Sequence, residues 1–281
     1  MTEGEGTLDG KVIIITGGGT GLGRSMAYRL AEEGADIVVA ARRIPPLEET
    51  AAGVRKLGRK ALVVSTDVTD STQCNNLIAK TLAEMGRIDV LINNAGIVRG
   101  ERPRPVWELT DQDWHTGIDV NLSGGFYCSR AVTKYFVDNK RGNIIMVASG
   151  EGFRGVRNNL MYTVAKAGVV NFTRTMALTL AEHNIRVNCV VPGFVDTFEY
   201  QPEEYQKAVA PMRAARTSTR LFIPVGHQGK PDDIGYLTLF LCSDASDYIT
   251  AGIFISDGGG LAGGFATTGY APLVSLKEGL A

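Results

Sequence analysis

The sequence predicts an α/β fold in which one sheet of seven parallel strands is wound between two layers of helices. Two observations lead to this prediction. Seven short runs rich in branched apolar residues alternate along the 281-residue chain with longer segments of helical spacing. The runs are apolar at successive positions, which indicates that helices cover both faces of the sheet. Repetition of strand, helix and strand then gives right-handed crossovers and a doubly wound sheet.

The individual elements follow from this alternation. The predicted strands cover residues 11–16, 36–41, 61–66, 88–93, 143–149, 185–191 and 252–256. The predicted helices cover residues 22–33, 47–57, 71–85, 111–137, 162–182 and 232–242. Strand periodicity lapses over residues 195–223, where a polar helical stretch intervenes. We expect this insertion either to cover a substrate at the carboxyl ends of the strands or to be a plain surface excursion.

The domain organisation is expected to be simple. No proline-rich linker, charge block or repeat divides the chain, so we expect one domain over residues 1–281, with a tail of small residues at 261–281. Hydrophobic residues make up 44% of the chain, enough for a sizeable core. The formal net charge of −1 offers no broad field for nucleic acid or an anionic membrane. The expected partner is therefore a small molecule.

Cysteine usage and the N-terminus bear on the compartment. The four cysteines are widely spaced and the three histidines have no ligand spacing, so we expect neither a disulfide framework nor a metal site. Residues 1–10 lack the basic start and apolar core of a signal peptide. No apolar run reaches the length of about 18 residues typical of a membrane span. We expect a soluble, cytoplasmic protein.

A glycine-rich turn joins the first predicted strand to the first predicted helix. Residues 16–23 read TGGGTGLG, which fits the pattern T-G-x-x-x-G-x-G. Such a turn lets backbone N–H groups at a helix N-terminus approach a pyrophosphate. Two alternatives stay open. The turn could be purely structural, or it could be a phosphate-binding loop of nucleoside triphosphatases, although that motif needs Lys where Arg24 stands.

Tyr162 and Lys166 stand four residues apart at the start of a predicted helix, so their side chains project from one face. A phenol with a pKa of about 10 is protonated at neutral pH, and a nearby ammonium stabilises the phenolate and lowers that pKa. Tyr162 would then exchange a proton with a substrate oxygen. Taken alone, the pair would more simply be an ordinary helix-surface Tyr and Lys.

Several short motifs in one order give this pair its context. The glycine turn, the run NNAG at 93–96, Ser149, Tyr162 with Lys166, and the dipeptide PG at 192–193 follow one another along the chain. In these motifs residues 8–260 resemble the short-chain dehydrogenase/reductase family. The resemblance implies a Rossmann-type fold and an oxidoreductase that acts on CH–OH groups, moving a hydride between a nicotinamide and a carbonyl or alcohol carbon.

By that resemblance four residues would form the catalytic site. Tyr162 would be the general acid or base, Lys166 would support it, Ser149 would bind the substrate oxygen, and Asn121 would hold a water of the proton relay. Structural alternatives stay open for two of them. Ser149 could satisfy backbone groups at a strand end, and Asn121 could contact only the backbone of its own helix.

The resemblance also implies a set of contacts to the cofactor, contributed by the glycine turn and by the ends of the strands. These residues are Gly17, Thr20, Gly21, Leu22, Gly23, Asp67, Val68, Asn94, Ala95, Gly96, Tyr162, Lys166, Pro192, Gly193, Val195 and Thr197. For Asp67, a role as the N-cap of the following helix is the alternative.

Arg42 and Arg43 follow the second predicted strand and predict NADP(H) as the cofactor in preference to NAD(H). This strand end faces the adenosine ribose in a dinucleotide fold, and an NAD enzyme needs a carboxylate there. Ala41 stands at that position, and the guanidinium of Arg42 suits a 2′-phosphate. The alternative is that both arginines are simply solvated.

Substrate and assembly are carried by the resemblance alone. The runs PDDI at 231–234 and DGG at 257–259 resemble the 3-oxoacyl carrier-protein reductase branch, which implies a 3-oxoacyl thioester or small ketone as substrate. Family members are commonly tetramers, so a homo-oligomer is implied. A single serine in ASG at 148–150 and the charged segment 151–160 depart from the family pattern. The alternative function is a cofactor-binding regulatory or scaffold protein without catalysis.

Overall fold

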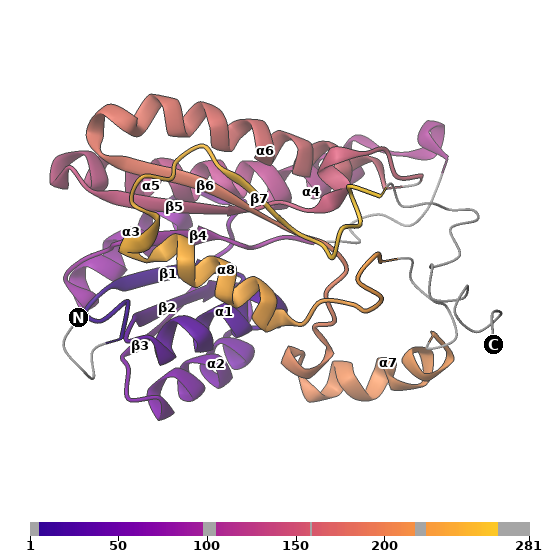
Figure 1. Ribbon diagram of the computed structural model, residues 1–281, viewed down its shortest axis with the longest axis horizontal. Helices are drawn as coiled ribbons and strands as arrows, with labels where there is room; N and C mark the ends of the chain where they lie inside the picture. The colour runs from indigo at the N-terminus through magenta and orange to yellow at the C-terminus, as the bar shows by residue number, and fades with distance from the viewer. Residues whose placement is uncertain (1–5, 98–104, 158, 217–222, 264–281) are drawn as a thin grey trace, which may run out of the picture.

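The computed structural model describes residues 6–97, 105–157, 159–216 and 223–263 (Figure 1). Seven strands form one sheet in the order β3-β2-β1-β4-β5-β6-β7, and every neighbouring pair is parallel. The strands are β1 (Val12–Thr16), β2 (Asp36–Ala41), β3 (Ala61–Ser65), β4 (Val90–Asn93), β5 (Gly142–Val147), β6 (Ile185–Pro192) and β7 (Ile253–Ser256). The predicted Rossmann-type fold is confirmed. Strand order reverses between β1 and β4, the place where such sheets bind ligands.

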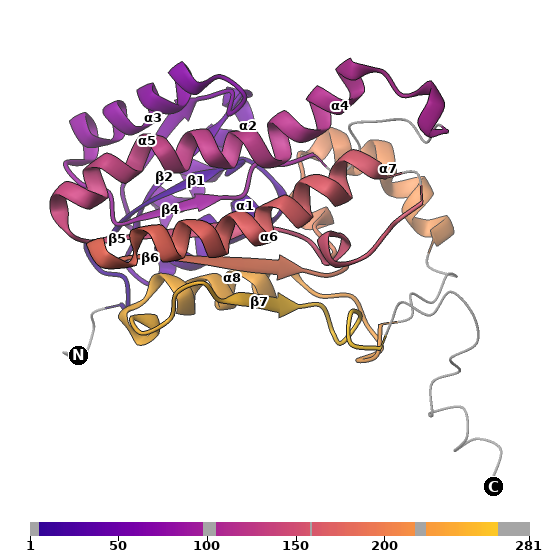
Figure 2. The same ribbon diagram turned by 90° about the horizontal axis from the view of Figure 1, so that it is seen from above.

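Helices cover both faces of this sheet (Figures 1 and 2). One layer holds α1 (Gly21–Glu32), α2 (Ile44–Lys56) and α8 (Pro231–Cys242), and the other holds α3 (Ser71–Met85), α4 (Asp111–Ile118), α5 (Gly124–Asn139) and α6 (Leu160–Leu180). An eighth helix, α7 (Glu203–Arg216), lies at the end of the molecule toward which the strands point (Figure 2). Of the helices in the described part of the chain, none combines the length and the apolar character needed to cross a membrane.

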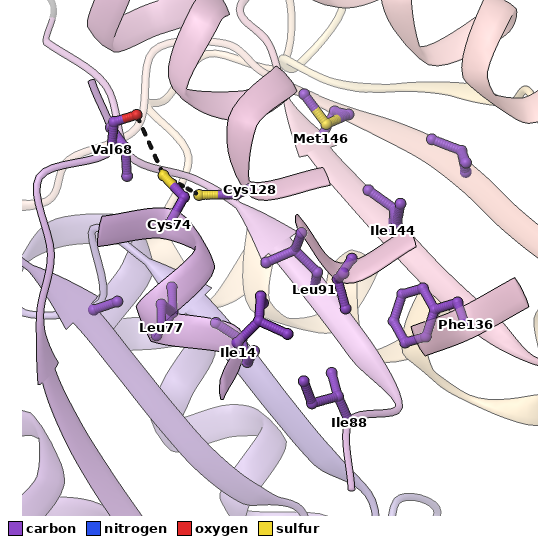
Figure 3. Close-up of a cluster of buried hydrophobic side chains, with 14 of the residues drawn as sticks. Ile14, Val68, Cys74, Leu77, Ile88, Leu91, Cys128, Phe136, Ile144 and Met146 are labelled. Atoms are coloured by element: carbon purple, nitrogen blue, oxygen red, sulfur yellow. Dashed lines mark hydrogen bonds between the residues drawn. The ribbon is translucent and has the colours of Figure 1, made fainter. Parts of the chain in front are cut away.

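Successive strand residues enter opposite cores, as the apolar runs predict. Ile14 of β1 belongs to the core beneath α3, α5 and α6, whereas its neighbours Ile13 and Ile15 belong to the core beneath α1, α2 and α8. The first of these cores also contains two sulfur atoms in contact (Figure 3). The Cys128 thiol donates to the sulfur of Cys74 at 3.4 Å. All four cysteines are free and buried.

The predicted helix over residues 111–137 is wrong in one respect, because two helices take its place. A single π-helical turn, Asp119–Ser123, separates α4 from α5. In this wider turn the buried side chain of Asn121 bonds both its own helix and a distant segment. Its Nδ2 donates to Gly117 O in α4 at 2.9 Å and to Ile97 O, after β4, at 3.1 Å. Tertiary hydrogen bonds thus favour an irregularity that apolar periodicity does not reveal, and π turns are often found at functional sites.

The insertion at 195–223 contains the 3₁₀ turn Phe198–Tyr200 and α7. Residues 217–222 of that insertion, and residues 264–281 of the expected tail, lie outside the described residues. The expected division of the chain into one domain, a covering insertion and a tail therefore stays a prediction.

Candidate active site

The glycine turn is built so tightly that side chains are excluded from it. Gly17 and Gly21 have φ values of 67° and 54°, a region that favours glycine. A Cβ atom on Gly23 would lie 2.3 Å from the carbonyl oxygen of Gly17. The N-cap residue of α1, Thr20, makes no side-chain cap hydrogen bond. The N–H groups of the first turn of α1 are therefore left for another acceptor, as a phosphate site requires.

The end of β4 holds this turn in place. The amide of Asn94 donates to Thr16 O at 2.9 Å and to Gly17 O at 3.3 Å. In return, Thr16 Oγ1 accepts from the backbone N–H groups of Asn94 and Ala95, each at 3.1 Å. Two of the predicted cofactor residues thus connect the glycine turn to the sheet.

Arg24, on which the nucleoside triphosphatase interpretation depends, is directed toward α2. Its Nη2 donates to Glu49 Oε2 at 2.7 Å and to Pro46 O at 3.2 Å. Its Nε donates to Gly19 O at 2.9 Å and to Thr50 Oγ1 at 3.1 Å. Because the guanidinium is buried in these contacts, it joins the glycine turn to α2. It is therefore not available to bind a terminal phosphate.

Two free cations lie at the end of β2, next to the turn. The backbone N–H of Gly17 donates to Ala40 O at 2.7 Å, which places this strand end beside the glycine turn. Arg42 and Arg43 follow it and are exposed. Within the described chain, neither guanidinium is held by an ion pair or a hydrogen bond, so both are available to an anionic ligand at this edge of the sheet.

At the end of β3, Asp67 does not cap the helix that follows. The N-cap of α3 is Asp70, whose carboxylate accepts from Thr72 N at 2.8 Å, so the N-cap role for Asp67 is wrong. Asp67 instead closes a short turn, accepting from Thr69 N at 3.0 Å. The next residue, Val68, is buried in the core and accepts the Cys74 thiol at its carbonyl oxygen (Figure 3).

The four predicted catalytic residues come together beyond the ends of β4 and β5. Ser149 follows β5, Tyr162 and Lys166 lie in the first two turns of α6, and Asn121 comes from the π turn. A small cavity is lined by Asn121 and Lys166 together with Asn93, Ala95 and Val68. Gly96 lies beside two of these residues, since a Cβ there would be 2.8 Å from Asn121 Oδ1 and 3.4 Å from Lys166 Nζ.

The hydrogen bonds agree with the structural alternative for Ser149, which satisfies a backbone group, and contradict the one for Asn121. Ser149 Oγ accepts from the backbone N–H of Glu151 at 3.2 Å, which leaves its own hydroxyl hydrogen for another acceptor. Asn121 Oδ1 accepts from Ile97 N at 3.1 Å, so its side chain does not contact only its own helix. The ammonium of Lys166 donates to Val147 O at 2.9 Å.

Burial governs the ionisation of the pair on α6. Burial of Lys166 lowers its pKa to about 8. The pKa of Tyr162 is raised above its ordinary value, chiefly by burial and further by the carboxylate of Glu151, although the nearby side chain of Ser149 lowers it. The expected lowering of this pKa by Lys166 is not found, because the ammonium faces Val147 O and lies 5.7 Å from the centre of the Tyr162 ring. Tyr162 is a protonated phenol at neutral pH.

The segment after β6 faces the glycine turn. Pro192 ends β6, and Gly193 N donates to Ser256 O at 2.9 Å, which anchors the exit of the strand. Val195 forms an isolated parallel bridge with Gly229. Thr197 comes next and immediately precedes the 3₁₀ turn Phe198–Tyr200.

Gln201 lies at this site but belongs to no motif, so nothing in the sequence indicates its role. Its Nε2 donates to Thr197 Oγ1 at 3.1 Å. A Cβ atom on Gly21 would lie 3.3 Å from Gln201 Nε2 and 3.7 Å from Thr197 Cβ. The hydroxyl of Tyr200 and Asp232 Oδ1 are 3.3 Å apart, which attaches the segment to α8. The side-chain amide of Gln201, a hydrogen-bond donor, therefore lies next to the first residue of α1.

Comparison with known proteins adds to this geometry. A family model described as short chain dehydrogenase matches residues 11–207. The 3-oxoacyl-[acyl-carrier-protein] reductase FabG of Thermotoga maritima is 36% identical over 254 residues, 90% of this chain and 98% of that protein. The 2-dehydro-3-deoxy-D-gluconate 5-dehydrogenase of Escherichia coli is 38% identical over 257 residues, 91% of this chain and 97% of that protein. A solved structure of 7α-hydroxysteroid dehydrogenase complexed with NADH and 7-oxo glycochenodeoxycholic acid has a TM-score of 0.81 at 30% identity, covering 92% of this chain and 98% of that one.

Proposed function

The chain belongs to the short-chain dehydrogenase family, and we propose that it is an NADP(H)-dependent oxidoreductase in which Tyr162 exchanges a proton with the substrate oxygen. As a member of this family it acts on CH–OH groups with a nicotinamide cofactor. The observation that carries the mechanism is the meeting of Ser149, Tyr162, Lys166 and Asn121 beside a glycine turn that excludes side chains. A purely regulatory or scaffold role would require none of the four.

The described residues fit a dinucleotide. We assign its pyrophosphate to the first turn of α1, where Gly21 and Leu22 start the helix and no side chain caps it. Thr197 and Gln201 face the same place from the other side, and we infer that the amide of Gln201 is a further donor to the pyrophosphate. Gly96, beside Lys166 and Asn121, leaves room for a ribose between the turn and the catalytic residues. When bound, the nicotinamide supplies or accepts the hydride.

The chain's own groups manage the proton and orient the substrate. Tyr162 carries its proton at neutral pH, so in the reducing direction it is a general acid toward a carbonyl oxygen. Ser149 also interacts with the Tyr162 side chain, and its hydroxyl can donate to the same oxygen. Lys166 lies one helical turn after Tyr162, with its ammonium beside Gly96, where it can donate to the hydroxyl groups of a ribose.

The preference for NADP(H) rests on the end of β2. Both Arg42 and Arg43 are exposed there, and nothing in the described chain neutralises them. The 2′-phosphate of NADP(H) would accept a charge-assisted hydrogen bond from Arg42. The 2′-hydroxyl of NAD(H) needs a carboxylate acceptor at this strand end, and Ala41 does not provide one. As substrate we propose a small ketone or a 3-oxoacyl thioester.

The test is the substitution Tyr162→Phe, which removes the hydroxyl and keeps the ring. Loss of a general acid typically lowers the rate by about 10²–10⁴-fold, and we expect kcat to fall by that factor while the Kd for NADPH changes little. The matched control is Tyr248→Phe, because Tyr248 is fully exposed and lies away from the site. Retention of more than a tenth of the wild-type rate in Tyr162→Phe would show that another group moves the proton.

A further inference from the structure

A carboxylate lies beside the proposed proton donor, although the proton chemistry gives it no task. Glu151 follows Ser149 by two residues, in the 3₁₀ turn Gly150–Phe153. Its backbone N–H donates to Ser149 Oγ at 3.2 Å, which ties it to the residue assigned to the substrate oxygen. Its charge also reaches the phenol, since it raises the pKa of Tyr162. A carboxylate here disfavours the phenolate, so a neutral residue would suit proton transfer better.

Asn159, which precedes Tyr162 in the chain, holds this carboxylate. It precedes α6, and its Nδ2 donates to Glu151 Oε2 at 2.6 Å. Its carbonyl oxygen accepts from Thr163 N at 3.2 Å and from Thr163 Oγ1 at 3.0 Å, which fixes its backbone. The side chains of Glu151 and Asn159 thus form one pair, placed one helical turn before Tyr162.

Helix capping does not explain this pair. An Asn at an N-cap usually accepts a hydrogen bond from the backbone N–H two or three residues later. Asn159 makes no such bond, and its amide is turned to Glu151 instead. Both residues are only half-buried, and in the described chain the second carboxylate oxygen of Glu151 has no hydrogen-bond donor. The pair therefore retains an open acceptor next to the catalytic residues.

We propose that Glu151 and Asn159 bind a hydroxyl group that the substrate carries next to its reacting carbon, so that the enzyme selects hydroxylated ketones over plain ones. A hydroxyl fits both members of the pair, because it donates to the carboxylate and its oxygen accepts the second Nδ2 hydrogen of Asn159. An ammonium group could serve only the carboxylate. The acyl chain of a thioester would leave both unpaired. This inference rests on the proposed oxidoreductase function and narrows its substrate.

The first test compares hydroxyacetone with butan-2-one, which have the same number of heavy atoms and differ in the hydroxyl. Hydrogen bonds to charged groups correspond to about a 10- to 100-fold preference, so the wild type should favour hydroxyacetone in kcat/KM by at least about tenfold. In Glu151→Gln and in Asn159→Ala this ratio should fall toward one, mainly through a higher KM for hydroxyacetone. The control Glu84→Gln, on exposed α3 surface, should keep the wild-type ratio.

Three results would overturn the proposal. A wild-type ratio near one refutes the selection of a hydroxyl. A ratio unchanged in both variants, with only the pH profile of Glu151→Gln displaced, means that the carboxylate acts on Tyr162 alone. A preference for aminoacetone over hydroxyacetone assigns the pair to ammonium.

Binding measurements separate this inference from the proposed function. The dissociation constants of both ketones can be measured by NMR on the cofactor-loaded Tyr162→Phe protein, which needs no turnover. If the wild type reduces neither ketone but hydroxyacetone still binds at least about tenfold more tightly, the proposed reaction is wrong and the hydroxyl site stands. Equal binding of the two ketones refutes the hydroxyl site whether or not the enzyme turns over.

Discussion

Lys166 should destabilise the folded protein, and its replacement by Met should therefore raise the melting temperature. The side chain is 4% exposed, and burial lowers its pKa from 10.5 to about 8. Met has a similar length and shape, and it needs no charge in the interior. The substitution removes the ionisable group while it preserves most of the packing.

The expected size follows from the two pKa values. A shift of one pKa unit corresponds to about 1.4 kcal/mol, so protonating the buried amine costs about 3 kcal/mol of folding free energy at neutral pH. The hydrogen bond from Lys166 Nζ to Val147 O is lost in the variant, which costs about 1 kcal/mol in the opposite direction. The net gain is about 2 kcal/mol, or roughly 4–8 °C for a protein of this size.

The pH dependence gives the prediction its sign. Because the folded-state pKa lies below the unfolded one, the unfolded chain binds more protons, and the wild type gains stability as the pH rises. The penalty is complete below pH about 8 and disappears toward pH 10.5, the range between the two values. Met has no such titration, so the advantage of Lys166→Met should shrink to about zero near pH 10.

Thermal unfolding followed by circular dichroism at several pH values between 7 and 10 tests this reasoning, with no cofactor added. The control is Lys134→Met, since Lys134 is exposed and its replacement should change stability by less than about 0.5 kcal/mol. The reasoning fails if Lys166→Met melts below the wild type at pH 7, or if the gap between the two proteins does not narrow toward pH 10.

Two further predictions concern the cofactor. The double variant Ala41→Asp/Arg42→Ile should reverse the preference from NADP(H) toward NAD(H), because it exchanges a guanidinium worth about 10- to 100-fold in affinity for an acceptor of the 2′-hydroxyl; unchanged kcat/KM ratios for the two cofactors would show that this strand end does not select between them. Gln201→Ala should weaken NADPH binding while the affinity for adenosine 2′,5′-bisphosphate, which has no pyrophosphate, stays the same. Gln201→Glu should weaken NADPH binding further through charge repulsion, and equal effects of the two substitutions would mean that Gln201 only supports Thr197.

The strands were predictable because each is apolar at consecutive positions. The predicted ranges agree with β1 to β7 to within about two residues at each end, and β2 agrees at both ends. The glycine turn was predictable for a similar reason, since the positive φ values of Gly17 and Gly21 are a demand that few other residues meet. In these places one local requirement determines the residue type.

The remaining features depend on contacts between distant segments. The π turn at Asn121 forms because its side chain bonds Ile97, 24 residues earlier, and nothing in the helical pattern indicates this. The pairing of Glu151 with Asn159 depends on how a loop folds back onto the start of α6. The raised pKa of Tyr162 depends on burial, so the spacing of Tyr162 and Lys166 alone suggests the opposite direction.

The π turn also bears on how this part of the chain can change in length. A π turn holds about one residue more than an α turn, so deleting one residue within Asp119–Ser123 would restore a regular helix from α4 to α5. Because α5 would keep nearly the same rotation relative to α4, the fully buried residues Cys128, Val132 and Phe136 would stay in the core. A deletion farther along α5 would instead rotate the residues beyond it by about 100°, which is the angle between successive residues of a helix. For protein engineering, the π turn is therefore the place where this part of the chain should best accept the loss of a residue, with the hydrogen bonds between Asn121 and Ile97 given up in exchange.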